Sequence, residues 1–242
     1  MDGMERVKTG ISGIDTMLYG GVPAQSQILI MGGPGSGKTL LTFNILYNIA
    51  KSGTNTAFIT FDEQPETVIR NAKETFSELT DIDSLVESKK LIVDGTASAA
   101  RMLTESTTDT MYSFGNIVSD LEGMIKSNDA KVVVIDSISL LKLMLDNEFT
   151  YYKSLLALVS NLKRIGVTTF LTTELRSLER KNLRFSPEFF IFDGIIAMYQ
   201  GEEEARRVLT MEVLKMRGSN HSRMLTPYEI VTKGFRIFTI EQ

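Results

Sequence analysis

The sequence predicts an α/β fold in which a mostly parallel central sheet is flanked by helices and continues into antiparallel strands near the C-terminus. Two observations predict the parallel part. Short apolar runs alternate with longer helical patterns, and several runs are continuous Val, Ile, Leu and Phe, as in strands buried on both faces. The antiparallel part is predicted because strand patterns follow one another directly beyond about residue 189. No linker or repeat divides the chain, so we expect residues 1–242 to form a single domain.

The parallel part is expected to alternate strand and helix. The expected strands are residues 27–31, 56–61, 90–93, 132–135 and 167–172. Helical patterns occupy residues 38–51, 65–76, 116–126 and 151–165. The last pattern has an apolar face at helical spacing, formed by Leu155, Leu158, Val159 and Leu162. Gly53 and Gly166 follow two of these helices, at positions where glycine commonly ends a helix.

The C-terminal part is expected to contain strands only. They cover residues 191–199, 207–215, 224–231 and 235–240. Residues 201–204 and 233–234 have the composition of hairpin turns. Earlier in the chain, residues 96–113 are rich in Thr, Ser and Ala with little periodicity, which indicates either a mobile loop or an irregular helix.

The composition excludes several kinds of chemistry. There is no cysteine and only one histidine, His221, which excludes disulfides, thiol catalysis and a multi-histidine metal site. The 26 Lys and Arg residues against 30 Asp and Glu residues give a net charge of -4, which argues against a protein whose main task is coating nucleic acid. Neither a bilayer-spanning apolar run nor a secretory signal is present, so we expect a cytoplasmic protein that does not enter a membrane.

The stretch GGPGSGKT, residues 32–39, joins the first expected strand to the first expected helix. It matches the pattern G-x-x-x-x-G-K-[ST] in the context that the pattern requires. A polyphosphate needs many donors in a small space, and glycines let backbone N–H groups wrap around its oxygens in front of a helix N-terminus. We therefore predict a triphosphate-binding loop rather than an ordinary glycine-rich turn.

Residues of this stretch have individual expected roles. Lys38 would place its ammonium group on the β- and γ-phosphates and is counted as catalytic, and the Thr39 hydroxyl would be a Mg²⁺ ligand. The expected nucleotide contacts are Gly33, Pro34, Gly35, Ser36, Gly37, Lys38, Thr39 and Leu40. These residues bind phosphates and do not identify the base.

A second acidic position supports this site. Asp136 ends the apolar run 131–136, at the sheet edge where ligands of parallel α/β folds bind. We expect Asp136 to hold Mg²⁺ through a water molecule. Aspartate often ends strands for no catalytic reason, so the prediction depends on the phosphate loop being nearby.

A pair of carboxylates follows the second expected strand. Asp62 and Glu63 should emerge at the same sheet edge as the phosphate loop, where one of them could polarise the water that attacks the γ-phosphate. Taken alone, the pair fits a solvated loop or the cap of the next helix better. Its position beside the phosphate loop favours the catalytic interpretation.

In this order, these residues resemble the RecA superfamily, and more closely its KaiC-like branch. The resemblance runs from residue 9 to about residue 238. The matching stretches are TGISGID at 9–15, GGVP at 20–23, TFDEQP at 60–65, IRNA at 69–72, VIDS at 134–137, LKRIG at 162–166, LTTE at 171–174, DGII at 193–196 and VLKMRGS at 213–219. General P-loop proteins lack the last stretch, which makes it the most discriminating.

The resemblance implies a RecA-like P-loop fold and a Mg²⁺-dependent ATPase that forms a homo-oligomeric ring, expected to be a hexamer, with ATP between neighbouring subunits. It implies that Lys215 and Arg217 reach the neighbour's phosphates, where an arginine stabilises charge on the γ-phosphoryl group. Two residues apart on a strand, they should point to one face. Without the resemblance, a solvated strand face would be the better interpretation. Ser219 and His221 are further expected nucleotide contacts.

The sequence also departs from the family pattern. The clock proteins of this branch carry two ATPase units in tandem, whereas this chain has one. Phe189 and Phe190 stand where their phosphorylated half has a Ser-Thr pair, so we do not expect phosphorylation there. Many relatives have Glu-Glu where this chain has Asp62 and Glu63. Because Asp is one methylene shorter, Glu63 is the expected base and Asp62 a helper, and turnover could be slow.

Three functions therefore stay open. The favoured one is a ring-forming ATPase with a regulatory or signalling role. The second is a DNA-binding recombination mediator, in which residues 137–148 and 174–188 would line the pore. The second of these loops is mildly basic through Arg176, Arg180, Lys181 and Arg184, with Phe185 as its one aromatic residue. The third is a nucleotide-gated switch with little turnover.

Overall fold

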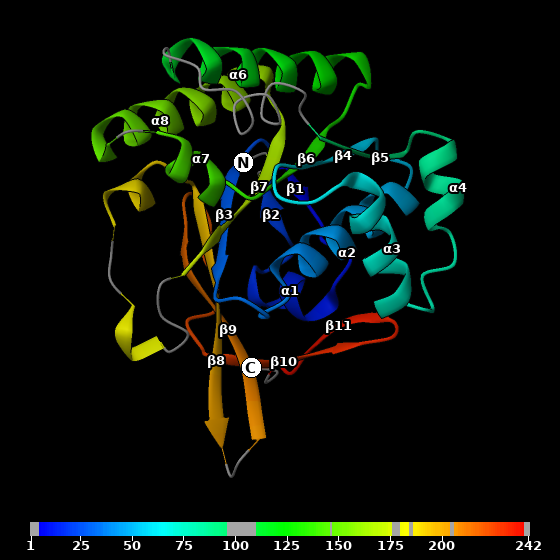
Figure 1. Ribbon diagram of the computed structural model, residues 1–242. Coiled ribbons are helices and arrows are strands. Elements are labelled where there is room, and N and C mark those ends of the chain that lie inside the picture. The colour runs from blue at the N-terminus through cyan, green and yellow to red at the C-terminus, as the bar shows by residue number, and fades with distance from the viewer. Residues whose placement is uncertain are drawn as a thin grey trace.

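The fold is built on a nine-stranded sheet, which is parallel on one side and antiparallel on the other (Figure 1). The structure is a computed structural model that describes residues 5–95, 110–145, 147–175, 180–183, 186–203 and 206–239. The spatial order of the strands is β11-β10-β9-β8-β3-β7-β6-β4-β5. All neighbours from β8 to β5 pair in parallel, whereas β8, β9, β10 and β11 pair antiparallel. The predicted fold class is confirmed.

The strand bounds follow the predicted runs with shifts of a few residues. The strands are β3 (Gln27–Gly32), β4 (Thr56–Thr60), β5 (Leu91–Gly95), β6 (Val132–Asp136), β7 (Thr168–Glu174), β8 (Gly194–Glu203), β9 (Arg206–Met216), β10 (Thr226–Val231) and β11 (Gly234–Ile237). A separate two-stranded sheet pairs β1 (Arg6–Val7) with β2 (Val22–Pro23).

Helices cover both faces of the sheet and create two apolar cores. One core contains residues of α1 (Ser12–Met17), α2 (Lys38–Lys51), α3 (Pro65–Thr75) and α4 (Ile82–Glu87), and the other contains residues of α6 (Thr110–Ser127), α7 (Ser139–Met144) and α8 (Glu148–Ile165). Alternate residues of β3 divide between them, since Ile28 and Ile30 lie in the first core and Leu29 and Met31 in the second. This two-sided burial explains the continuous apolar run of β3.

Helix ends follow local sequence signals. The Asn147 side chain accepts a hydrogen bond from the Thr150 N–H at 2.9 Å and caps α8, which begins at Glu148, three residues before its predicted start. Gly53, with φ +98°, follows the α2 C-cap, and Gly166, with φ +82°, is the C-cap of α8, as predicted. Of the residues 96–113, the last four belong to α6 and the others lie outside the described residues.

Some sequence predictions were wrong. Residues 201–203 belong to β8 and not to a turn, because the strand pairing continues, with Gly201 opposite Val208 and the acidic Glu202 opposite the basic Arg207. The last strand ends at Ile237 and not at residue 240. The short helices α1, α4 and α7 and the 3-10 turns η1 (Arg180–Asn182) and η2 (Pro187–Phe190) were not predicted. No helix in the described ranges is long and apolar enough to cross a membrane.

Candidate functional site

The phosphate loop lies between the end of β3 and the start of α2, as its sequence predicted. Two of its glycines have left-handed backbone angles, with φ +76° at Gly35 and φ +87° at Gly37. A Cβ atom at Gly37 would lie 2.7 Å from the Ile230 side chain. Side-chain-bearing residues are therefore disfavoured at Gly37 both by conformation and by space.

Lys38 folds back over this loop. Its Nζ donates to the Gly32 carbonyl at 2.9 Å and to the Gly33 carbonyl at 3.2 Å. Burial lowers the pKa of Lys38, although the negative charges of Glu174, Asp136 and Asp62 oppose that shift. The ammonium group therefore lies among carboxylates at the carboxyl ends of the parallel strands.

Asp136 joins three elements at this edge. Its Oδ2 accepts a hydrogen bond from the Thr39 hydroxyl at 2.8 Å, and its Oδ1 accepts one from the Thr172 hydroxyl on β7. Asp136 is buried, and that burial raises its pKa. A hydroxyl and a carboxylate side by side are the oxygen ligands that Mg²⁺ uses in nucleotide sites, where water and phosphate complete the coordination. These residues therefore fit a Mg²⁺ ion, although no group of three or more His, Cys, Asp or Glu with metal-site geometry occurs among the described residues.

The two predicted catalytic acids have different environments. Asp62 accepts a hydrogen bond from the Ser137 hydroxyl at 2.7 Å, whereas the Glu63 carboxylate accepts only a long one, at 3.3 Å, from the Asn71 side chain on α3. Partial shielding from solvent is the main cause that raises the pKa of both carboxyls, and the charges of Asp136 and Asp62 raise that of Glu63 further. Glu63 is thus the less constrained acid.

A pocket of about 300 Å³ adjoins the phosphate loop. Apolar side chains of α2 and α3 form part of its wall, and polar side chains, including that of Glu63, form the rest. The lining residues are Thr39, Leu40, Phe43, Glu63, Val68, Asn71, Ala72 and Thr75. The sequence analysis predicted the first two and Glu63. The others were missed because the packing of α3 on α2 brings them together.

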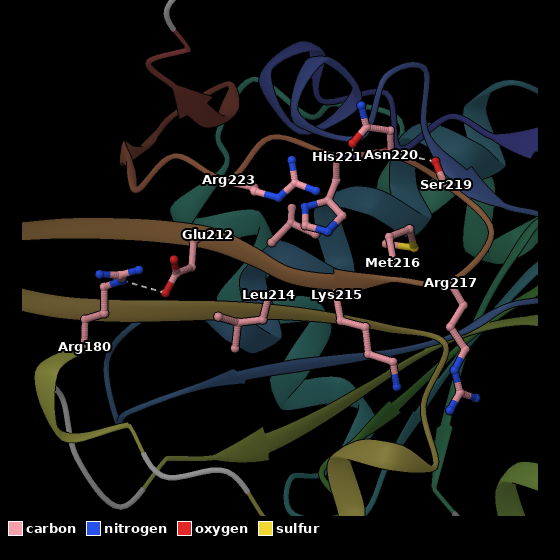
Figure 2. A pocket seen from close by; sticks show the side chains of 11 residues that line it. Arg180, Glu212, Leu214, Lys215, Met216, Arg217, Ser219, Asn220, His221 and Arg223 are labelled. Atoms are coloured by element: carbon pink, nitrogen blue, oxygen red, sulfur yellow. Dashed lines mark hydrogen bonds and ion pairs between the residues drawn. The ribbon is translucent and has the colours of Figure 1, made fainter.

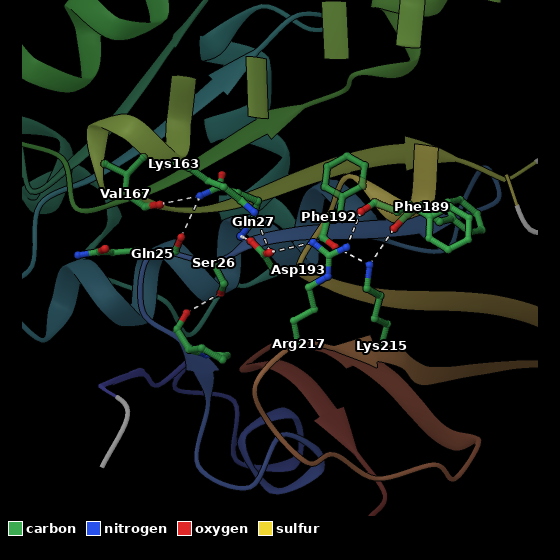
Figure 3. Close-up of polar contacts among 12 residues, drawn as sticks. Gln25, Ser26, Gln27, Lys163, Val167, Phe189, Phe192, Asp193, Lys215 and Arg217 are labelled. Atoms are coloured by element: carbon green, nitrogen blue, oxygen red, sulfur yellow. Dashed lines mark hydrogen bonds and ion pairs between the residues drawn. The ribbon is translucent and has the colours of Figure 1, made fainter. Parts of the chain in front are cut away.

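Lys215 and Arg217 lie together, but far from Lys38. The Lys215 Nζ donates to the carbonyls of Phe189 at 3.1 Å and Phe192 at 2.7 Å, and Arg217 donates to the Phe190 carbonyl at 2.7 Å (Figure 3). Burial, and then the charge of Arg217, lower the pKa of Lys215. Arg217 is not on the strand as predicted, because β9 ends at Met216.

The strand register places these cations at the opposite sheet edge from the phosphate loop. Met216 pairs with Gly194, which pairs with Ile28 near the start of β3. The loop begins after Gly32, four residues further along β3, which is roughly 13 Å at strand spacing. A bulge around residue 214 precedes Lys215, and bulges commonly re-aim side chains.

A second pocket, of about 590 Å³, adjoins these cations (Figure 2). Its lining is strongly cationic and includes the expected contacts Ser219 and His221. The lining residues are Arg180, Glu212, Val213, Leu214, Lys215, Met216, Arg217, Ser219, Asn220, His221 and Arg223. Arg180, Asn220 and Arg223 were not predicted as part of this site. A sequence signal existed for the last two, which lie within six residues of Arg217.

The only carboxylate in this lining is already engaged. Glu212 is buried and accepts hydrogen bonds from Arg180 Nε and the Tyr199 hydroxyl, both at 2.8 Å. Arg180 is the one arginine of the basic loop that the structure describes, since Arg176, Arg184 and Phe185 lie outside the described residues. Its pairing with Glu212 ties the loop to β9 and does not favour a role as a nucleic-acid contact.

Comparison with known proteins is consistent with this geometry. The family described as "ATPase: KaiC" matches residues 7–242. The circadian clock oscillator protein KaiC of Picosynechococcus sp. is 31% identical over 240 residues, and KaiC 1 of Synechocystis sp. is 30% identical over 240 residues. Both alignments cover 98% of this chain, which spans 45% of the length of those relatives. The crystal structure of a KaiC-like protein from Pyrococcus horikoshii OT3 superposes with a TM-score of 0.81 at 30% identity, over 98% of this chain and 100% of that one.

Proposed function

Because this chain belongs to the KaiC family of ATPases, we propose that it binds ATP at residues 33–40 and hydrolyses it to ADP and phosphate with Mg²⁺. The observation that carries the proposal is the contact between Thr39 and Asp136. It places an expected Mg²⁺ ligand of the phosphate loop against the acid at the end of β6, with Lys38 and Glu63 at the same sheet edge.

The residues divide the work as follows. Backbone N–H groups of the loop and the α2 N-terminus cradle the phosphate oxygens, and Lys38 binds the β- and γ-phosphates. Thr39 and Asp136 would hold Mg²⁺, which supplies positive charge to the phosphate oxygens when bound. Glu63 accepts a proton from the water whose oxygen attacks the γ-phosphorus, and ADP leaves. Asp62, held by Ser137, helps to keep the water oriented.

The pocket of about 300 Å³ is the proposed site for the base and ribose. Leu40, Phe43 and Val68 offer apolar contact to a purine, and Asn71 and Thr75 offer polar groups. Its position directly beside Thr39 leaves the phosphates over the loop.

We also propose that copies of this chain form a ring, expected to be a hexamer, in which Lys215 and Arg217 act on the neighbour's ATP. Within one chain these cations lie at the far edge of the sheet, and together with Arg223 they line the second pocket. A neighbour's triphosphate would supply a further anion, because the one carboxylate of this lining, Glu212, is already bound by Arg180. Ser219 and His221, in the same lining, would be further contacts. The ring would serve a regulatory or signalling role, with residues 1–242 as one domain.

Two substitutions test the proposed activity. In Lys38→Ala, Mg²⁺-dependent release of phosphate should vanish, because the triphosphate loses its main cation. In Glu63→Gln, turnover should fall on the order of a hundredfold or more while ATP binding persists, because the water loses its base. Lys51→Ala, on the same helix but exposed, and Glu66→Gln, exposed on α3, are the matched controls. Normal turnover in both test variants would reject the assignment.

Single-turnover hydrolysis separates an ATPase from a switch. The wild-type chain is mixed with ATP and Mg²⁺ at protein excess, and ADP is measured beside the dissociation constant of ATP. Product that accumulates over time supports the enzyme. Tight binding without detectable ADP would instead identify a nucleotide-gated switch.

A further inference from the structure

The phosphate loop is held from outside by two side chains of the antiparallel strands. The Tyr228 hydroxyl on β10 donates to the Ser36 carbonyl at 2.6 Å. Gln200 Nε2 on β8 donates to the Pro34 carbonyl, also at 2.6 Å. Both donors are buried, with 2% of Tyr228 and 7% of Gln200 exposed. The Pro34 and Ser36 carbonyls therefore each have a fixed partner on the outward side of the loop, the side that faces β8 and β10.

These two hydrogen bonds fix the direction of two amide N–H groups. A trans peptide unit is planar, and its C=O and N–H point in opposite directions. When the Pro34 carbonyl points outward to Gln200, the Gly35 N–H points to the other side of the backbone. When the Ser36 carbonyl points outward to Tyr228, the Gly37 N–H does the same. If the loop binds phosphate as proposed, that other side is the one that faces the phosphate oxygens, which need donors.

The loop needs such anchors because its glycines do not fix these peptide units. Gly35 and Gly37 have positive φ angles, and glycine occupies many backbone conformations at similar energy. The side chains of Ile230 and Phe235 pack near Gly37, but apolar contacts do not select the orientation of a peptide dipole. The hydrogen bonds from Tyr228 and Gln200 do select it.

We propose that Tyr228 and Gln200 are positioning residues that hold the Gly37 and Gly35 amides toward the phosphates, an inference that rests on the proposed function of the loop. Their partners are 192 and 166 residues away in the sequence. The antiparallel strands therefore carry Gln200 at the edge of the sheet beside the phosphate loop and Lys215 at the opposite edge. The antiparallel strands β8 to β11 would thus support the chain's own phosphate loop and present cations to a neighbour.

Tyr228→Phe tests the proposal because it removes one hydroxyl and keeps the packing. With Mg²⁺ present, calorimetry should give dissociation constants for ATP and ADP about tenfold higher than in the wild type, equivalent to about 1.4 kcal/mol. The affinity for adenosine, which has no phosphate, should change less than twofold. KM for ATP should rise with kcat little changed, because the interaction acts on bound substrate and transition state alike.

Tyr199→Phe is the matched control. Tyr199 is as buried as Tyr228 and also donates one hydrogen bond, but to Glu212 and not to the loop. It should lose comparable thermal stability while the affinity for ADP stays within twofold. Gln200→Met, which keeps the side-chain length without a donor, should weaken ATP and ADP binding in the same direction as Tyr228→Phe, and it carries the test alone if Tyr228→Phe does not fold.

The outcomes are separable from those of the proposed function. Phosphate affinities within twofold of the wild type in Tyr228→Phe and Gln200→Met would overturn the positioning role while leaving the ATPase intact. Equal weakening of adenosine and ADP would overturn it too, because a general structural loss would then explain the effect. A wild-type chain that binds no triphosphate would overturn both proposals.

Discussion

The two edges of the sheet, at the carboxyl ends and at the amino ends of the parallel strands, carry different charged groups. At the carboxyl ends of the parallel strands, Lys38 lies among the carboxylates of Asp62, Asp136 and Glu174, so one chain supplies both signs of charge. At the far edge, Lys215 and Arg217 are paired mainly with backbone carbonyls, and the buried carboxylate of the adjoining pocket is already bound by Arg180. The first edge therefore combines both signs of charge, whereas the second has an excess of positive charge.

That difference gives the proposed ring a physical basis. Lys215 has a pKa lowered by burial and by Arg217, so its charged form is under-compensated in the single chain. Arg217 is half-exposed, and its guanidinium lies 3.5 Å from a carboxylate oxygen of Asp193, which is a weak contact. An anion brought by a second copy would stabilise both cations. The carboxylate-rich edge differs, because its carboxylates already face the Lys38 ammonium group of the same chain.

The largest effect is expected from removing one cation of the far edge. Arg217→Ala should lower kcat on the order of a thousandfold, since an arginine that stabilises the γ-phosphoryl charge contributes at least that much in related chemistry. Binding of ATP to the chain's own loop should persist. Mixing Arg217→Ala with Lys38→Ala subunits should restore part of the activity, because some interfaces then combine an intact loop with an intact arginine.

The control is Arg236→Ala, an exposed arginine of the antiparallel strands that pairs with Glu229. It should leave kcat unchanged, and mixing it with Lys38→Ala should add no activity beyond that of the Arg236→Ala subunits themselves. If mixed rings form, as shown by co-purification of differently tagged subunits, and no activity returns, the arginine does not act across an interface.

The pH profile of kcat should have an acid limb set by Glu63 at the phosphate-loop edge and an alkaline limb set by Lys215 at the far edge. In the proposed mechanism Glu63 accepts a proton only when ionised, and its pKa is raised above 4.5, so kcat should fall about tenfold per pH unit below that raised value. Lys215 would bind the neighbour's phosphates only when protonated, and its pKa is lowered from 10.5, so activity should also fall as pH rises through the lowered value.

Lys215→Arg sharpens the pH comparison. Because an arginine stays charged throughout, the alkaline limb should move to higher pH while the acid limb stays. The measurement is kcat at saturating ATP across the stable pH range. An alkaline limb that does not move would belong instead to Lys38, whose pKa is also lowered, and thus to the phosphate-loop edge.

Sequence reasoning reached the two edges by different routes. The phosphate loop and Asp136 could be predicted because their chemistry lies in contiguous residues next to strand and helix patterns. Lys215 and Arg217 came from a family resemblance, because two cations near a strand end also fit a solvated surface. The short helices α1 and α4 contain only six residues each, too few for a periodic pattern to be recognised.

Other features depend on packing that no local pattern encodes. The turn predicted at 201–204 was wrong for residues 201–203, because their strand pairing with residues 206–208 outweighed turn composition, and residue 204 lies outside the described residues. Val68, Asn71 and Thr75 line the pocket beside the phosphate loop only because α3 packs beside α2. Tyr228 contacts Ser36 across 192 residues of sequence. From the sequence alone, a tyrosine in a strand is read as an ordinary core residue, because nothing in the local pattern names its hydrogen-bond partner.

The smallest expected effect concerns the support of the far edge. Asp193 accepts hydrogen bonds from the Gln27 N–H at 3.0 Å and from Lys163 Nζ at 2.8 Å, and it faces Arg217. Asp193→Asn should lower the free energy of unfolding by about 1 kcal/mol, because an amide keeps the first bond and weakens the charged contacts. A denaturant titration measures this loss of stability.

The ATP affinity of the chain's own loop should not change in Asp193→Asn, since Asp193 lies at the opposite ends of the strands. The value of kcat should fall only a few-fold, because Arg217 keeps its bond to the Phe190 carbonyl. A large loss of ATP affinity would show that the two edges of one chain are coupled, and the division of labour between them would then be wrong.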